Sequence, residues 1–280
     1  MIMIKLKKSN LPQILLIIGL LVLCIIMLAP FSWIISTSLR LPRDSFTLPP
    51  AFLPTAFHLD SYTEVFRQFP FVQVIMNSLK VAGIIVIANL FISTMAGYAF
   101  ARIDFKGRDT IFLIILAGMM IPAQAKLIPT FIVMSQMGFV GSHASLILPA
   151  IMSPLNIFFV RQFMKTIPKS YEEAAYLDGA GRFTIYLKVF LPMSKSVIMM
   201  TSLLSFLASW NDFINPLIFI SKFERATLPL ALSILNGAQG NGSVSVVFAG
   251  VAMSLVIPFF IYCFGQKYIL QSVVMSGLKS

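Results

Sequence analysis

The chain has 280 residues, of which 58% are hydrophobic and 11% are charged, and its mean hydropathy is +0.90. These values lie far outside those of soluble globular domains, so they exclude a soluble enzyme and predict an integral membrane protein. The net charge of +11 does not indicate nucleic-acid binding, because the basic residues occupy short segments between apolar runs, where cations ordinarily set membrane topology.

Six apolar runs are long enough to be membrane-spanning helices. They cover about residues 11–36, 76–100, 110–134, 142–162, 196–220 and 244–265. The first run follows three lysines, as in a signal peptide, but it is much longer than the apolar core of one and has no clear cleavage site. We therefore expect it to remain as an uncleaved span and residues 1–280 to form a single membrane domain.

The charge distribution predicts the orientation of these spans. Most of the 21 lysines and arginines fall in the two tails, in residues 101–109 and in the loop 163–195, which all share one side if six spans alternate. Cytoplasmic segments carry an excess of cations. Both termini and the loop 163–195 are accordingly predicted to be cytoplasmic.

The two cysteines give no sign of metal or redox chemistry. Cys24 and Cys263 both lie inside apolar runs and have no metal-type spacing. We interpret them as buried small hydrophobic residues.

The loop 163–195 contains a charged segment with strong helix signals. Ser170 followed three residues later by Glu173 forms a capping box, which predicts a short helix from about Tyr171. Gly179 is a typical residue at a helix end because glycine adopts the left-handed conformation easily. The loop is expected to contain one helix before this glycine and another after it.

The second short helix is predicted over residues 183–190, with Pro192 at the start of the next span. The result would be a helix-turn-helix on the cytoplasmic face. Such a segment can dock into a groove on a cytosolic partner, or it can rest on lipid headgroups as an amphipathic pair. The residues by themselves favour neither reading.

The string E-A-A-x-x-D-G-A, followed after about a dozen residues by L-P, resembles the cytoplasmic loop motif of the permease subunits of binding-protein-dependent ABC importers. The fixed positions are Glu173, Ala174, Ala175, Asp178, Gly179, Ala180, Leu191 and Pro192. Six spans with the motif between the fourth and fifth resemble the carbohydrate branch, particularly the maltose-type second permease. The strings F-V-R-Q-F at 159–163 and W-N-D-F at 210–213 also resemble that branch.

This resemblance implies an all-α type I importer fold with six transmembrane helices and a coupling helix-turn-helix between spans 4 and 5. It also implies that the chain shares a pathway with a second permease, expected to be a different chain. An extracytoplasmic solute-binding protein would deliver a sugar or oligosaccharide. Two cytosolic ATPase subunits would bind the loop through the motif residues and Glu172, and would hold the ATP and Mg.

The resemblance thus implies a non-catalytic, multi-pass subunit in a bacterial-type cell membrane, with no cofactor of its own and no nucleic-acid partner. The alternative function is a stand-alone ion-coupled transporter. That alternative needs ionisable residues near the membrane midplane and usually an inverted repeat. No repeat is evident in the sequence, and the acidic residues cluster in loops.

Polar residues inside the spans are candidates for the translocation pathway, because an unpaired polar group in lipid is costly. We single out Trp210, Asn211, Asp212 and Asn156. Asp212 can contact sugar hydroxyls or form part of a gate. Alternatively, it can be a structural partner in a hydrogen bond between helices, or it can lie near the outer end of its span, and the sequence leaves these roles open. The same ambiguity applies to Asn77, Asn89, Gln124 and Asn156, and Asn215 is a further residue that can face the pathway beside Asp212.

Overall fold

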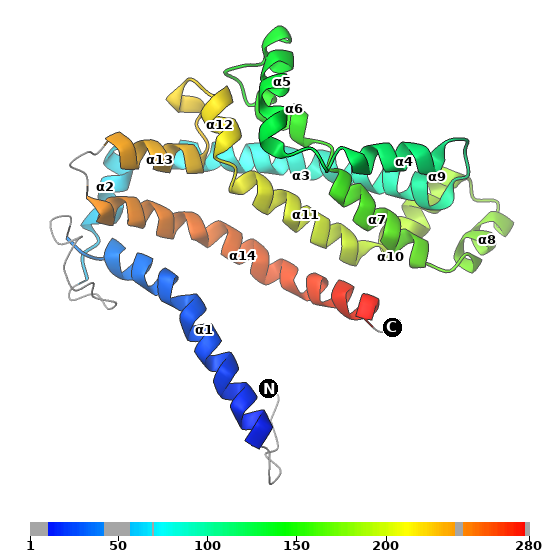
Figure 1. Ribbon diagram of the computed structural model, residues 1–280, viewed down its shortest axis with the longest axis horizontal. Helices are drawn as coiled ribbons and strands as arrows, with labels where there is room; N and C mark the ends of the chain where they lie inside the picture. Colours follow the sequence, from blue (N-terminus) through cyan, green and yellow to red (C-terminus); the bar gives the residue numbers. More distant parts are fainter. Residues whose placement is uncertain (1–10, 42–56, 69, 239–242, 278–280) are drawn as a thin grey trace. The chain divides into compact units, whose positions relative to one another are not determined.

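The computed structural model describes residues 11–41, 57–68, 70–238 and 243–277. Within these ranges every regular element is a helix, which confirms the predicted all-α class (Figure 1). The chain falls into two compact units, Met1–Phe69 with Leu235–Met253, and Pro70–Ile234 with Ser254–Ser280. The loop 163–195 and the predicted pathway residues all lie in the second unit.

Among the described residues, the first unit contains α1 (Leu11–Ser38), α2 (Asp60–Gln68), the last turn of α13 (Leu228–Ala238) and the first turns of α14 (Val244–Gly277). Most large apolar side chains of α1 are exposed, as a helix surrounded by lipid requires. Its last turn is anchored instead, since the hydroxyl of buried Ser38 lies 2.8 Å from that of Tyr62.

The second unit consists of short and long helices in sequence. They are α3 (Phe71–Arg102), α4 (Arg108–Ala117), α5 (Ala123–Gln136), α6 (Ala144–Ala150), α7 (Pro154–Thr166), α8 (Ser170–Leu177), α9 (Arg182–Ile185), the π-helix η2 (Tyr186–Phe190), α10 (Leu191–Met193), α11 (Lys195–Trp210), α12 (Ile214–Phe219), the 3-10 helix η3 (Phe223–Arg225), α13 (Leu228–Ala238) and the later part of α14. α13 and α14 each pass from one unit to the other.

The core of the second unit is built around α3, which packs along α7 and α11. Gly97 allows the close approach of α3 and α7, because a Cβ at this position would lie 2.5 Å from Cγ1 of Val160. Val160 is fully buried. A small residue at a helix contact is a common device for bringing membrane helices together.

Within the described ranges, four helical segments are long and apolar enough to cross a membrane. They are Gln13–Ser38, Phe71–Arg102, Ala144–Thr166 and Val244–Lys267. A fifth candidate is the pair Arg182–Met193 and Lys195–Trp210, whose axes are bent by 79°. The candidates overlap the first, second, fourth, fifth and sixth predicted runs, and the count of six spans stays a prediction.

The third predicted run, 110–134, forms two helices rather than one continuous helix. α4 ends at Ala117 and α5 begins at Ala123, with turns at residues 118–122 between them. Pro122 stands immediately before α5 and has no N–H to continue the hydrogen bonding of a helix. The apolar composition that predicted a span did not show this break.

The fifth predicted run, 196–220, is also interrupted, at residues 211–213 between α11 and α12. Asp212 Oδ1 accepts a hydrogen bond from the backbone N–H of Asn215 at 3.2 Å, a local bond that competes with helix continuation. Pro216 acts in the same direction, because its ring would clash with the carbonyl of residue 212 in a continuous helix.

The cysteine interpretation was wrong. Cys24 and Cys263 are both exposed on the surface of the chain. They lie in α1 and α14, whose apolar side chains largely face outward instead of packing into a protein core.

Candidate functional site

The motif helix α8 begins one residue earlier than predicted. Ser170 is its first residue, and the carbonyl of Lys169 accepts hydrogen bonds from the N–H groups of Glu172 and Glu173 at 2.9 and 3.0 Å. Because Lys169 takes the capping position, without a side-chain bond, the predicted capping box is not formed. The S-x-x-E string is compatible with a helix that begins at Tyr171 and with one that begins at Ser170. The structure has the helix that begins at Ser170.

The end of α8 at Gly179 is confirmed. Gly179 has φ of +80°, a left-handed conformation that costs a residue with a Cβ about 1–2 kcal/mol. The N–H of Ala180 donates to the carbonyl of Ala175 at 2.9 Å, and the N–H of Gly179 donates to that of Tyr176 at 3.0 Å. These two bonds form a complete Schellman motif, so the turn has a defined geometry.

A helical segment follows the turn, but it differs from the predicted single helix over residues 183–190. It begins at Arg182 with α9, continues as the π-helix η2 and ends with α10 at Met193. Pro192 lies in α10, and the next long helix, α11, begins at Lys195 rather than at the proline. Tyr186 and Phe190 of η2 are buried against Tyr98 of α3, which fixes this segment to the core.

The residues of the loop motif divide between an exposed face and a packed face. The exposed ones are Glu173, Ala174, Asp178, Gly179 and Pro192, whereas Glu172, Ala175, Ala180 and Leu191 are half-buried. Large apolar side chains accompany the exposed set, including Leu177 at 90% exposure and Phe183 at 63%. An exposed face of this composition is suited to contact another protein.

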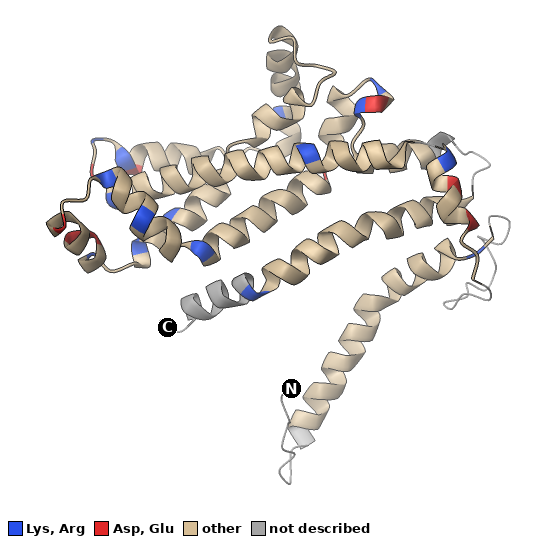
Figure 2. Cartoon of the chain, turned by 180° about the vertical axis from the view of Figure 1, so that it is seen from behind, with Lys and Arg blue, Asp and Glu red and all other residues tan. Residues whose placement is uncertain are grey.

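Charged side chains gather at the end of the second unit that carries α8 (Figure 2). The side chains of two arginines there are buried. Arg102 donates to the carbonyls of Met164 and Ile167 and pairs with Glu172, whose Oε2 lies 3.8 Å from its Nη1. The sequence showed these arginines only as topology signals, because their partners are remote in the chain.

The second buried arginine, Arg161, joins α7 to the helices beside it. Its Nε donates to the carbonyl of Phe100 at 3.2 Å, and its Nη2 donates to Asp109 at 3.1 Å. Its guanidinium also lies 3.9 Å from the centre of the Phe112 ring. The Arg108 guanidinium bonded to Asp109 lowers the pKa of that carboxyl and so favours its ionised form.

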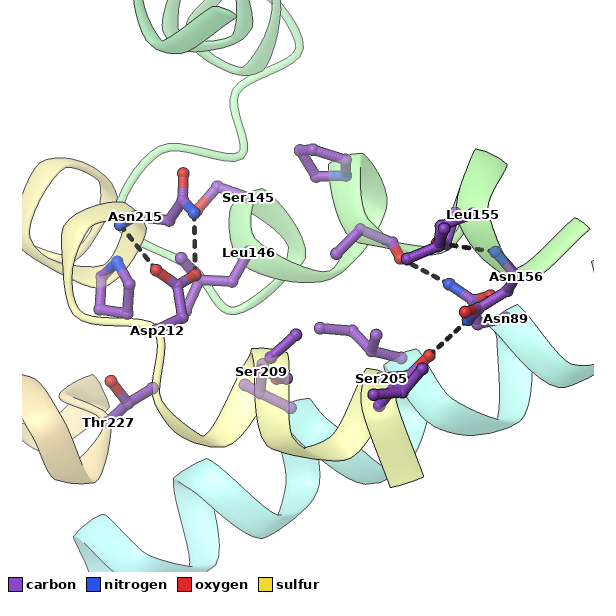
Figure 3. Close-up of a pocket in the computed structure, with 18 residues that line it drawn as sticks. Asn89, Ser145, Leu146, Leu155, Asn156, Ser205, Ser209, Asp212, Asn215 and Thr227 are labelled. Atoms are coloured by element: carbon purple, nitrogen blue, oxygen red, sulfur yellow. Dashed lines mark hydrogen bonds between the residues drawn. The ribbon is translucent and has the colours of Figure 1, made fainter. Parts of the chain in front are cut away.

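A polar pocket of about 450 Å³ lies between α3, α6, α7, α11 and α12 (Figure 3). One side holds a hydrogen-bonded cluster of buried groups. Asn156 Nδ2 donates to Asn89 Oδ1 at 2.9 Å and to Ser205 Oγ at 2.7 Å. Asn89 Nδ2 in turn donates to the carbonyl of Ala150 at 3.2 Å, so it satisfies backbone at the break between α6 and α7.

Asp212 lies at the other end of the polar pocket, where α11 ends (Figure 3). Its Oδ2 accepts a hydrogen bond from Asn215 Nδ2 at 2.8 Å, besides the backbone bond from the same residue. Lys, Arg and His are absent from the described residues that line the pocket. The pocket therefore offers amide, hydroxyl and carboxylate groups, which hydrogen-bond to uncharged polyhydroxyl compounds.

Only two of the four predicted pathway residues line the polar pocket. Asn156 and Asp212 line the polar pocket, but Trp210 is buried and stacks on Phe206, and exposed Asn211 bonds to the carbonyl of Leu207. Ser205 was missed, since a lone serine in an apolar run has no distinctive signal. The part of the chain that the structure describes contains no cluster of His, Cys, Asp or Glu that could hold a metal ion.

Comparison with known proteins shows that the chain is a permease of a transport system. Residues 88–270 match the family "Binding-protein-dependent transport system inner membrane component". The chain belongs to this family, which confirms the resemblance found in the sequence.

Two relatives and one solved structure show how far the similarity extends. The chain is 32% identical to the arabinooligosaccharides transport system permease protein AraQ of Halalkalibacterium halodurans, over 98% of this chain and 99% of the relative. It is 30% identical to the trehalose/maltose transport system permease protein MalG of Thermococcus litoralis, with the same coverage. Its fold is similar to a chain of a bacterial ABC transporter involved in alginate import, with a TM-score of 0.81, 24% identity, and 95% and 100% of the two chains covered.

Proposed function

We propose that this chain is the translocation permease of an ATP-driven importer and that the exposed face of α8 is where a cytosolic ATPase binds. The observation that supports this most directly is that some motif residues are exposed while others pack against the rest of the chain. Glu173, Ala174 and Leu177 are exposed, while the Schellman turn at Gly179 fixes the end of the helix.

The complete importer would contain one further permease, two ATPase subunits and an extracytoplasmic solute-binding protein. ATP and Mg would belong to the ATPase, whose closure would move α8 and its attached helices as a rigid body. Both termini would lie in the cytoplasm, in agreement with the distribution of cations.

The substrate class that the pocket and the relatives support is an uncharged sugar or oligosaccharide. Several relatives are named for arabinooligosaccharides, trehalose/maltose or lactose. The polar pocket would form part of the pathway, with Asn156 and Asp212 beside the passing hydroxyl groups. Asn89, Ser205 and Asn215 hold these two side chains in place through the hydrogen bonds described above.

Uptake by cells provides the test, with radiolabelled arabinotriose, maltose, trehalose and lactose as probes. We expect Glu173→Lys to abolish uptake of whichever sugar the unmodified chain transports, because reversing an exposed charge would repel the docked ATPase. Glu173→Asp, which keeps the charge, is the matched control and should retain uptake. Immunoblots of membrane fractions check that each variant is inserted.

Two outcomes would contradict the proposal. The first is full uptake by the Glu173→Lys variant. The second is gradient-driven uptake by the purified chain alone in liposomes without ATP, which would favour the ion-coupled alternative.

A further inference from the structure

The side chain of Arg102 is held at a junction of three segments. Arg102 is the last residue of α3, and only 5% of its side chain is exposed. Its guanidinium donates to the carbonyls of Met164 and Ile167 at the end of α7. A cation at the C-terminus of a helix satisfies carbonyls that have no partner within that helix.

The same guanidinium contacts two segments of the motif loop. Its Nη1 lies 3.8 Å from Oε2 of Glu172 on α8, and its central carbon lies 4.7 Å from the ring centre of fully buried Phe190 on η2. Only 15% of the Glu172 side chain is exposed. One side chain of α3 therefore contacts the segments before and after the turn at Gly179.

Two further residues of α3 contact the loop on the same side. The hydroxyl of Thr94 lies 2.8 Å from that of Tyr186, and the hydroxyl of Tyr98 donates to the carbonyl of Arg182 at 3.3 Å. Thr94, Tyr98 and Arg102 are spaced by four residues, so they lie in a row along one face of α3. The end of α3 thus holds η2 and α8 together.

Glu172 and Glu173 differ in what they contact, although they are adjacent in the motif. Successive residues of an α-helix point about 100° apart, so the packed side of α8 takes Glu172 and leaves Glu173 exposed. A buried charge needs a partner, because leaving Arg102 without one is strongly unfavourable. Glu172 supplies the carboxylate that Arg102 needs.

We propose that Arg102 and Glu172 are positioning residues that form an intramolecular clasp, the Arg102–Glu172 clasp, which fixes the orientation of α8. Glu172 binds within the chain, and Glu173 is left to contact the partner. A helix that is already oriented loses less entropy when it docks, so the clasp strengthens ATPase binding without touching the ATPase. The last step rests on the proposed function, whereas the fixed orientation of α8 does not.

The orientation can be measured with two spin labels on the full-length chain in nanodiscs. Cysteines at Ile84 of α3 and Leu177 of α8, both exposed, would carry the labels after Cys24 and Cys263 are replaced by serine. Pulsed EPR should give a narrow distance distribution for the otherwise unmodified chain. Glu172→Gln should broaden it, because an amide cannot neutralise Arg102.

Arg102→Lys tests the other partner and keeps the positive charge, so that folding is preserved. A lysine cannot serve two carbonyls and a carboxylate with the fixed fork of a guanidinium, and we expect a smaller broadening. Asp104→Asn is the matched control. It breaks the pair between Asp104 and Arg108, where 93% of the Asp104 side chain is exposed, and should leave the distribution unchanged.

The affinity for the co-purifying ATPase is the second measurement, made on chains without spin labels. Glu172→Gln should raise the Kd roughly fivefold or more, the range typical of coupling between sites, and Asp104→Asn should not change it. Unchanged distances and Kd in the Glu172→Gln variant would refute the clasp. If the unmodified chain binds no ATPase but Glu172→Gln still broadens the distances, the proposed function fails and the clasp stands.

Discussion

Individual residues in the motif loop have different structural roles. Gly179 is the clearest case, because its role depends on its backbone conformation. Its positive φ allows the two hydrogen bonds that close the end of α8. No side chain takes part in these bonds, so the requirement is for a backbone conformation and not for a contact. Space does not limit substitution either, since a Cβ at this position would meet nothing within 4 Å.

Gly179→Val should therefore lose uptake through strain. A β-branched residue disfavours a positive φ, and the expected cost of about 1–2 kcal/mol or more would unwind the last turn of α8. Sugar uptake by cells, normalised to the amount of chain in the membrane, measures the effect. Gly181→Ala is the control, because Gly181 has φ of −74° and open space around its Cα. Equal loss in both variants would disprove a role for the positive φ.

The packing of helices in the second unit depends on one close contact between α3 and α7. A Cβ on Gly97 would approach Cγ1 of Val160 to 2.5 Å and the backbone nitrogen of Arg161 to 3.1 Å. Relief would require the two helices to separate. Arg161 bonds to the end of α3 and to Asp109, so a separation of the helices would also disturb these hydrogen bonds.

We expect Gly97→Ala to destabilise the protein by about 1–3 kcal/mol through overpacking. Thermal unfolding in detergent should show a lower midpoint than the unmodified chain. Val160→Ala in the same chain should recover part of the loss, because it removes Cγ1, the atom in closest contact. Gly83→Ala in the same helix serves as control, since a Cβ there meets nothing within 4 Å. A midpoint for Gly97→Ala as high as that of Gly83→Ala would contradict the expected overpacking.

The elements differ in how far the sequence could predict them. Composition was enough for the long apolar helices, and Gly179 was enough for the end of α8, because few other residues adopt its conformation. The π-helix η2 could not be predicted, since it depends on packing of Tyr186 and Phe190 against α3. The breaks at 118–122 and 211–213 were missed because their flanking residues are as apolar as those of an unbroken helix.

The candidate sites also differ in how far the sequence could predict them, because some of their residues are neighbours in the chain and others are far apart in it. The motif residues are adjacent in the chain, so a single string located them. The Asn89–Asn156 pair joins residues 67 positions apart, and the Arg102–Glu172 pair joins α3 to α8. Such pairs exist only once the helices are packed, and one sequence contains no record of the pairing.

The broken segments constrain how the protein can sit in a membrane. Backbone groups outside a helix cannot face hydrocarbon, because they have no hydrogen-bonding partner there. Residues 118–122, where Met120 is 85% exposed, should therefore be covered by another protein chain or by water. The exposed apolar surface of α1 has no such restriction.

Lipid quenching can test this difference in the assembled importer. A bimane label on Met120→Cys should be quenched weakly by lipids that carry doxyl groups at several depths. A label on Ile25→Cys, which is 68% exposed on α1, should be quenched strongly. Both variants need Cys24 and Cys263 replaced by serine. Strong quenching at residue 120 at any depth would show that the break faces lipid, contrary to the expectation.

The length of α3 sets how far the motif loop stands from the membrane. Its 32 residues extend about 48 Å, against about 30 Å for the hydrocarbon core of a bilayer. The helix is therefore long enough to cross the hydrocarbon core even when it is tilted. We expect Arg102, as its last residue, to lie beyond the core, where a soluble protein can reach the motif loop without entering the lipid.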